Sequence, residues 1–209
     1  LKENIEKVKG FFITHGHEDH IGAIPYVMRE INVPIYATKL TIGIIDNKLR
    51  EHNMLTKVKR KVVKYGQHIN LGCFRVEFIR TNHSIQDAAA LAIYSPAGIV
   101  VHTGDFKVDY TPVFGDAIDL QRFGEIGKRG VLALMCDSTN AERPGFTNSE
   151  RTVGKTFDNI FAEHSNTRII IATFASNVDR VQQIINSAYK FGRKVVVEGR
   201  SMVNIITTA

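Results

Sequence analysis

The sequence predicts an α/β protein whose organisation changes near Gly145. Before that residue short strands and loops dominate, whereas after it helices and strands alternate. Such an alternation is typical of βαβ units and predicts a parallel sheet. A doubly wound domain needs more strands than this second part holds, so we expect that part to be incomplete. The composition, 44% hydrophobic and 23% charged, is that of an ordinary soluble globular protein.

Short strands are predicted throughout the first part. Apolar runs bounded by turn residues predict strands at 11–14, 33–37, 62–65, 74–81, 88–95, 98–102 and 131–136. Apolar and charged residues alternate along 74–81, which is typical of an antiparallel strand. The run 131–136 is apolar and predicts a buried strand, and we expect Gly66 and Gly72 to bracket a turn.

Helices are predicted in both parts. In the first part they cover 21–31 and 38–52, the second having apolar residues near helical spacing. In the second part they cover 149–163, 177–191 and the residues from 201 onward, with strands at 168–174 and 194–198 between them. Ser149 and the pair Ser176–Asn177 are the expected N-caps.

The bulk features favour a cytoplasmic protein without a membrane partner. Cys73 and Cys136 are too few for a disulfide framework, and we expect them to be buried, reduced thiols. No apolar run approaches the ~18 residues that span a bilayer, and no secretory signal is visible. Because the chain begins with Leu1, we expect it to be a piece of a longer protein.

The net charge of +6 is concentrated in one segment. Residues 48–64 contain seven Lys or Arg and one acid, so this segment carries +6 and the remainder sums to zero. A local basic patch suits a polyanion such as nucleic acid, and Lys59, Arg60 and Lys61 are its candidate contacts. The alternative is a solvated helix and loop with incidental charge.

The segment His15-Gly16-His17-Glu18-Asp19-His20 is the most informative part of the sequence. Imidazole and carboxylate groups are the usual ligands of Zn²⁺ and related cations. A regular strand points alternate side chains to opposite faces, whereas a turn at a strand end can gather them. The segment therefore predicts a metal site, with two ions expected. A solvated, His-rich loop is the alternative.

Two further residues extend the predicted ligand set. His83 follows the strand at 74–81, and Asp105 follows the strand at 98–102, so both lie at strand ends where loops converge on one cleft. A carboxylate can bridge two cations, and two such ions lower the pKa of a shared water. We expect His102 to be structural and the remaining histidines, at 52, 68 and 164, to lie at the surface.

These motifs resemble a known superfamily. The order His15-x-His17-x-Asp19-His20, then His83, then Asp105, is similar to the metal-binding pattern of the metallo-β-lactamase superfamily. This resemblance implies an αβ/βα sandwich over residues 1–147, without the N-terminal strands that normally precede the cluster.

A further motif narrows the resemblance to one branch. Asp137-Ser138-Thr139 resembles the first motif of the β-CASP branch of nucleic-acid hydrolases, which implies a partial β-CASP α/β domain over 148–209. Other stretches are similar to the ribonuclease J family in particular: 14–22, 101–107, 137–142, 172–177 and 199–202.

The resemblance implies a role for each matching residue. His15, His17 and His83 would hold one Zn²⁺, Asp19 and His20 the other, and Asp105 would bridge them; Mn²⁺ or Mg²⁺ are alternatives to zinc. The reaction implied is hydrolysis of RNA phosphodiester bonds, as a 5′-exonuclease, an endonuclease or both. Asp19 would orient the attacking hydroxide and handle its proton. Asp137 would hydrogen-bond a ligand His, with a cap at the strand end as the alternative.

RNA is the implied partner, beside a second copy of the chain or a paralogous subunit. Ser176–Asn177 and Arg200–Ser201 stand at predicted helix N-termini, where backbone N–H groups favour anions, so they are candidate contacts to RNA phosphates. Plain N-capping is the alternative for these residues.

Two other functions stay open at this point. One is a non-catalytic RNA-binding subunit of a ribonuclease complex, and the other is a metallo-hydrolase that acts on a thioester or lactone. The family also has a further metal-binding His and a Ser-Gly-His-Ala-like segment that this sequence lacks. We expect truncation at both ends, which would leave the second metal short of a ligand.

Overall fold

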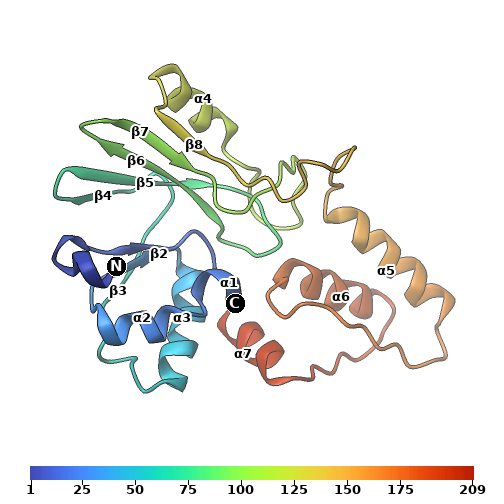
Figure 1. Cartoon of the computed structure of the whole chain (residues 1–209). Helices are drawn as coiled ribbons and strands as arrows, with labels where there is room; N and C mark the ends of the chain where they lie inside the picture. The colour runs from blue at the N-terminus through green and yellow to red at the C-terminus, as the bar shows by residue number, and fades with distance from the viewer.

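The computed structural model describes residues 1–209, the side chain of Lys2 excepted, and has two stacked sheets with helices outside them (Figure 1). The smaller sheet is parallel and consists of β1 (Phe11–Phe12), β2 (Ile35–Ala37) and β3 (Arg60–Val62). The larger sheet has the order β4 (His68–Leu71), β5 (Phe74–Arg80), β6 (Ala89–Ser95), β7 (Gly98–His102) and β8 (Ala133–Met135). Its pairs are antiparallel except β7–β8, which is parallel.

Helices cover the outer faces of both sheets, which confirms the sandwich. A 3₁₀ helix, η1 (Lys2–Lys7), precedes β1, and α1 (Glu18–Ile21), α2 (Ile24–Glu30) and α3 (Lys39–Glu51) belong to the side of the smaller sheet. Helix α4 (Leu120–Lys128) lies over the larger sheet, where Ile126 packs on Ile79, Ala90 and Val101. Helices α5 (Arg151–Glu163), α6 (Val178–Lys190) and α7 (Arg200–Thr208) follow.

Between the sheets, the core is formed by every second side chain along the strands, those that point inward. Phe78 of β5 is fully buried there and packs with Val76, Leu91 and Tyr36. A second core joins the smaller sheet to its helices, with Ile45 and similar side chains at helical spacing on the inner face of α3. These two cores hold the strand ends, and therefore the loops that follow them, in fixed relative positions.

Several sequence expectations in the first part are wrong. The helix expected at 21–31 begins earlier, at Glu18, and is divided around Gly22–Ala23. Gly66 and Gly72 bracket strand β4 rather than a turn. The strand at 131–136 is the exposed edge of its sheet, with Leu134 62% exposed. Cys73 and Cys136 are exposed, not buried, because the first lies in a hairpin turn and the second follows that edge strand.

In the second part the helices form and the strands do not. Helices α5, α6 and α7 confirm the expected helical segments, and Asn177 caps α6 by accepting from the Arg180 N–H. Within residues 148–209 the segments 168–174 and 194–198 have no strand pairing, so the expected parallel sheet is absent there. A helix satisfies its own backbone hydrogen bonds, whereas a strand needs a neighbour.

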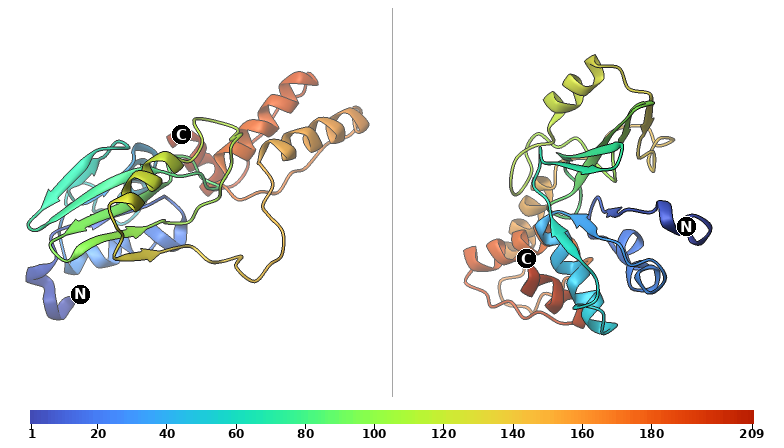
Figure 2. Two further views of the ribbon diagram at one scale, coloured as in Figure 1. Left: turned by 90° about the horizontal axis from the view of Figure 1, so that it is seen from above. Right: turned by 90° about the vertical axis from the view of Figure 1, so that its left-hand side faces the viewer.

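The second part lies against one end of the sandwich. Figure 2 shows α5 and α6 side by side, beyond the end of the sheets that is remote from the N-terminus. Helix α7 returns to α3, where the Asn47 amide donates to the Thr208 hydroxyl at 2.9 Å. Among residues 1–209, with the Lys2 side chain left aside, no helix is long and apolar enough to cross a membrane.

Candidate metal centre

Three loops at strand ends bring the predicted ligands together. The segment His15–His20 follows β1 and ends in the first turn of α1, whereas His83 follows β5 and Asp105 follows β7. The turn before Asp105 needs glycine, because Gly104 has φ +60° and an added Cβ would lie 3.0 Å from the Ala89 carbonyl oxygen. The glycine at position 104 therefore allows the loop that carries Asp105 to pack closely against the backbone of Ala89.

One group of three imidazoles can hold a cation. Nitrogens of His15, His17 and His83 all lie within 4.8 Å of one another. The tightest approach joins His83 Nε2 and His17 Nδ1, 3.1 Å apart. Convergent imidazole nitrogens at this separation are typical of a tetrahedral Zn²⁺ site that leaves one position for water or substrate.

A second group lies beside the first and shares a residue with it. His15, His20 and Asp105 also place ligand atoms within 4.8 Å. Asp105 Oδ2 lies 3.5 Å from His20 Nε2, 3.8 Å from His15 Nε2 and 3.8 Å from His83 Nε2. This oxygen therefore lies between the two groups, the place that a bridging carboxylate would take.

Burial keeps the imidazoles neutral and available as ligands. Burial first, and then the neighbouring His20 and His83, lower the pKa of His15 to about 2. Burial and His17 likewise lower the pKa of His83 to about 4, against the opposing charges of Asp105 and Asp137. At neutral pH each of these rings therefore keeps one unprotonated nitrogen with a free lone pair, as metal ligation requires.

One buried atom tests whether a cation fits. His15 Nε2 is buried, and among the described residues it has no hydrogen-bond partner. The other ring nitrogen, Nδ1, lies 3.1 Å from Thr14 Oγ1, so the ring is oriented with Nε2 toward Asp105. A buried polar atom without a partner is costly unless something binds it. The donor set and this atom both fit a divalent cation.

Asp19 and Asp137 lie at the edge of this cluster. The Asp19 carboxylate is 3.5 Å from His20 Nε2, but its side chain is 78% exposed, so it lies at the mouth of the site. Asp137 accepts from both the N–H and the hydroxyl of Thr139, and at 3.5 Å from the Phe106 N–H. Within the described residues no hydrogen bond joins Asp137 to a ligand His; its charge acts on His83 over a longer distance.

The three candidate RNA contacts of the basic segment, residues 59–61, differ in exposure and in their partners. Lys59 is exposed, and the Lys61 ammonium lies 5.2 Å from the centre of the Tyr36 ring. Arg60, however, pairs with Asp46 at 2.6 Å and donates to the carbonyls of Leu55 and Val58. Arg60 therefore holds its own loop together, whereas Lys59 and Lys61 are the more exposed of the three RNA candidates.

The candidate helix N-termini also differ from one another. Asn177 is buried and its side chain caps α6, which matches the N-capping alternative. Ser176 beside it is half-buried, whereas Arg200 and Ser201 are exposed at the start of α7. These four residues lie at the N-termini of α6 and α7 and not among the metal-ligand candidates.

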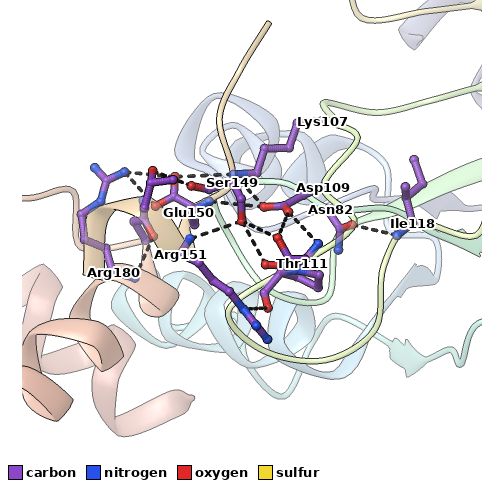
Figure 3. A network of polar contacts seen from close by, with 12 residues as sticks. Asn82, Lys107, Asp109, Thr111, Ile118, Ser149, Glu150, Arg151 and Arg180 are labelled. Carbon is purple, nitrogen blue, oxygen red and sulfur yellow. Dashed lines mark hydrogen bonds and ion pairs between the residues drawn. The ribbon is translucent and has the colours of Figure 1, made fainter. Parts of the chain in front are cut away.

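A polar network beside the site has no local signal in the sequence. A cavity of about 310 Å³ adjoins His83 and is lined by Lys107, Asp109, Glu150 and Asp179 among others. Figure 3 shows Lys107 and Asp109 next to Ser149 and Glu150, which begin the second part of the chain. Its members lie far apart in the sequence, so only the fold brings them together.

Two family models match the chain. The metallo-beta-lactamase superfamily covers residues 1–131, and the ribonuclease J beta-CASP domain covers residues 166–209. A crystal structure of a protein of unknown function from Enterococcus faecalis superposes with a TM-score of 0.64 at 20% identity, over 86% of this chain and 45% of that one. That likeness concerns the fold alone.

Curated relatives agree with the family models. The chain is 47% identical to ribonuclease J of Synechocystis, over 100% of this chain and 33% of that protein. It is 46% identical to ribonuclease J 1 of Streptococcus pyogenes, over 99% of this chain and 36% of that protein. The chain thus spans about a third of the length of these relatives. The sandwich fold, the two family models and the curated relatives agree with one another. The chain therefore belongs to the metallo-β-lactamase superfamily, in its ribonuclease J group.

Proposed function

We propose that this chain carries the metal centre of a ribonuclease that hydrolyses RNA phosphodiester bonds. The observation that carries the proposal is the convergence of His15, His17, His83 and Asp105 at a buried imidazole nitrogen, His15 Nε2, that has no hydrogen-bond partner among the described residues. The names of the curated relatives supply the substrate class. Zinc is the proposed ion, because neutral imidazoles outnumber carboxylates in the set.

Each residue has a proposed role at this centre. His15, His17 and His83 would hold one ion, His20 with Asp19 would hold a second, and Asp105 would bridge them. Bound divalent cations supply Lewis-acid chemistry, since they acidify water and offset the charge that develops on a phosphodiester. Exposed at the mouth, the Asp19 carboxylate orients the attacking water and accepts its proton at an oxygen.

The remaining parts of the proposal concern organisation and substrate. We place the domain boundary between residues 147 and 148, in the linker between β8 and α5. Lys59, Lys61, Arg200 and Ser201 are the proposed contacts to RNA phosphates, with Ser176 as a weaker candidate. Because the proposed substrate is cellular RNA, we place the protein in the cytoplasm. As partners we propose a second copy of the chain or a paralogous subunit.

Metal content and RNA cleavage test the proposal together. The full-length protein is incubated with 5′-monophosphorylated and 5′-triphosphorylated RNA, beside Asp19→Ala and Cys73→Ser, the latter an exposed control in the turn between β4 and β5. We expect cleavage by the wild type and Cys73→Ser, inhibition by a chelator, and loss of cleavage in Asp19→Ala. Equal cleavage by wild type and Asp19→Ala would reject the mechanism. RNA binding without any bound metal would favour a non-catalytic subunit.

A further inference from the structure

The first turn of α6 is joined directly to the loop that carries His83. Gln86, on that loop, donates from its amide Nε2 to Asp179 Oδ1 at 2.6 Å. Asp179 is only 8% exposed, and burial raises the pKa of its carboxyl group while the bond from Gln86 opposes that rise. A buried carboxylate is costly without donors, so this bond stabilises one position of the loop relative to α6.

The same turn reaches the second ligand loop through an ion-pair chain. Arg180 pairs with Glu150 at 3.0 Å, and Glu150 lies 3.6 Å from the Lys107 ammonium. Lys107 also lies 3.5 Å from Asp109, on the loop that follows Asp105. Figure 3 shows these side chains in one continuous network. Two neighbouring residues of α6 thus contact, directly or through Glu150 and Lys107, two of the three loops that carry the metal-ligand candidates.

We propose that Asp179 is a positioning residue that fixes the His83 loop through Gln86 and so sets the metal affinity of the centre. The inference rests on the proposed metal centre and deepens it, because it assigns a role to a residue of the second part. Metal ligation tolerates only small displacements of a donor atom, so a loosened loop weakens binding. Among the described residues, no hydrogen bond or ion pair joins Asp179 to a ligand candidate.

The structure offers a matched control for mere docking of the two parts. Thr208 of α7 accepts from the Asn47 amide of α3, a contact between the same parts that involves no ligand loop. Thr208→Val removes this bond at nearly constant volume. If docking alone mattered, Thr208→Val and Asp179→Leu would act alike.

The experiment measures loop protection and metal affinity in Asp179→Leu, Asp179→Asn, Gln86→Met and Thr208→Val. Asparagine keeps a carbonyl oxygen for Gln86, so it serves as the conservative rescue. We expect amide hydrogen exchange at 83–87 in the metal-free chain to rise at least tenfold in Asp179→Leu and Gln86→Met. Zn²⁺ affinity, from chelator competition, should fall roughly 10- to 100-fold in both. Asp179→Asn and Thr208→Val should stay within about threefold of wild type.

The double variant Gln86→Met/Asp179→Leu separates a shared link from two independent losses. If the two side chains act through one bond, the double variant is no worse than either single variant. Unchanged exchange and affinity in Asp179→Leu, or an equal loss in Thr208→Val, would overturn the inference and leave the metal centre standing. A wild-type chain that binds no Zn²⁺ would overturn the proposed centre, even if Asp179→Leu still loosens the loop.

Discussion

The two parts of the chain differ in what their apolar side chains pack against. In the sandwich every strand has a neighbour, and Phe78 between the sheets is fully buried. In the second part Ile170 is 88% exposed and Val196 81% exposed, on segments that were expected to be strands. The expected strands of both parts are apolar runs; they differ in that only those of the sandwich pair with a neighbouring strand. All the metal-ligand candidates belong to the part whose strands are paired.

The largest expected effect falls on a ligand candidate within the well-packed part. His83→Ala removes one of the three converging imidazoles and should weaken Zn²⁺ binding by more than about 100-fold, because loss of an outer partner alone costs 10–100-fold. Chelator competition measures the affinity. His164→Ala, an exposed histidine of the second part, should leave it unchanged. Equal losses in both variants would remove the contrast between the parts.

The second-largest expected effect is the loss of unfolding free energy when a buried phenylalanine is truncated, and this loss should differ between the two parts. Phe78→Ala opens a cavity between two sheets and should lower the free energy of unfolding by about 4 kcal/mol. Phe161→Ala, in the small cluster between α5 and α6, should lower it by about 2 kcal/mol because that cluster is open on one side. Urea denaturation of both variants gives the comparison. A larger cost at Phe161 would contradict the account.

A buried ion pair in the larger sheet should have an intermediate effect. Glu77 is 2% exposed and accepts from Arg122 of α4 at 2.7 and 3.0 Å and from the Tyr94 hydroxyl at 2.7 Å. Burial opposes its ionisation, but these bonds hold the pKa of Glu77 below the ordinary 4.5. Glu77→Gln should destabilise the fold by about 2 kcal/mol at pH 7.

The pH dependence of that variant follows from the sign of the shift. Because the folded pKa of Glu77 is depressed, its stabilising contribution is complete above pH 4.5 and disappears as the pH falls through the folded value. The stability gap between wild type and Glu77→Gln should therefore narrow below about pH 4.5. Glu125→Gln, which removes an exposed partner of the same Arg122, should cost much less. A constant gap would contradict the assignment.

The smallest effect concerns the basic segment. Lys59→Ala with Lys61→Ala should weaken RNA binding and reduce the slope of log affinity against log salt by about 2, if each lysine neutralises one phosphate. Arg60→Ala should leave this slope unchanged and lower stability instead, since Arg60 pairs with Asp46. Filter binding over a salt series measures the slope. An unchanged slope in the double variant would make the lysines ordinary solvated side chains.

Local patterns predicted the elements that depend on local interactions. Helix α3 follows from apolar residues at helical spacing, and β5 follows from alternation. Helix α4 was missed because Gly124 and Gly127 interrupt its pattern. Glu77 stands on the charged side of β5, which alternation assigns to solvent, yet α4 covers that side and buries it. Burial of a sheet face depends on distant elements that alternation does not report.

The candidate site divides in the same way. The strand-end positions of His15, His83 and Asp105 were visible in the sequence, and the fold brings these three residues together. The link between Gln86 and Asp179 spans residues far apart in the chain and involves no motif. Arg60 was assigned by its charge alone, whereas its partner Asp46 lies on a neighbouring helix. Sequence patterns predicted which side chains have the chemistry to bind a metal ion or RNA. Tertiary contacts decide which of those side chains are already engaged by other residues.

X-ray absorption at the zinc edge identifies the atoms that coordinate a bound ion, and so it is the sharpest test of the proposed metal centre. The chain is equilibrated with Zn²⁺, freed of excess ion, and compared with His83→Ala. We expect a first coordination sphere dominated by imidazole nitrogen at about 2.0–2.1 Å. We also expect loss of imidazole scattering in the variant. A zinc environment of oxygen ligands without imidazole, or a spectrum that His83→Ala does not change, would contradict the proposed metal centre.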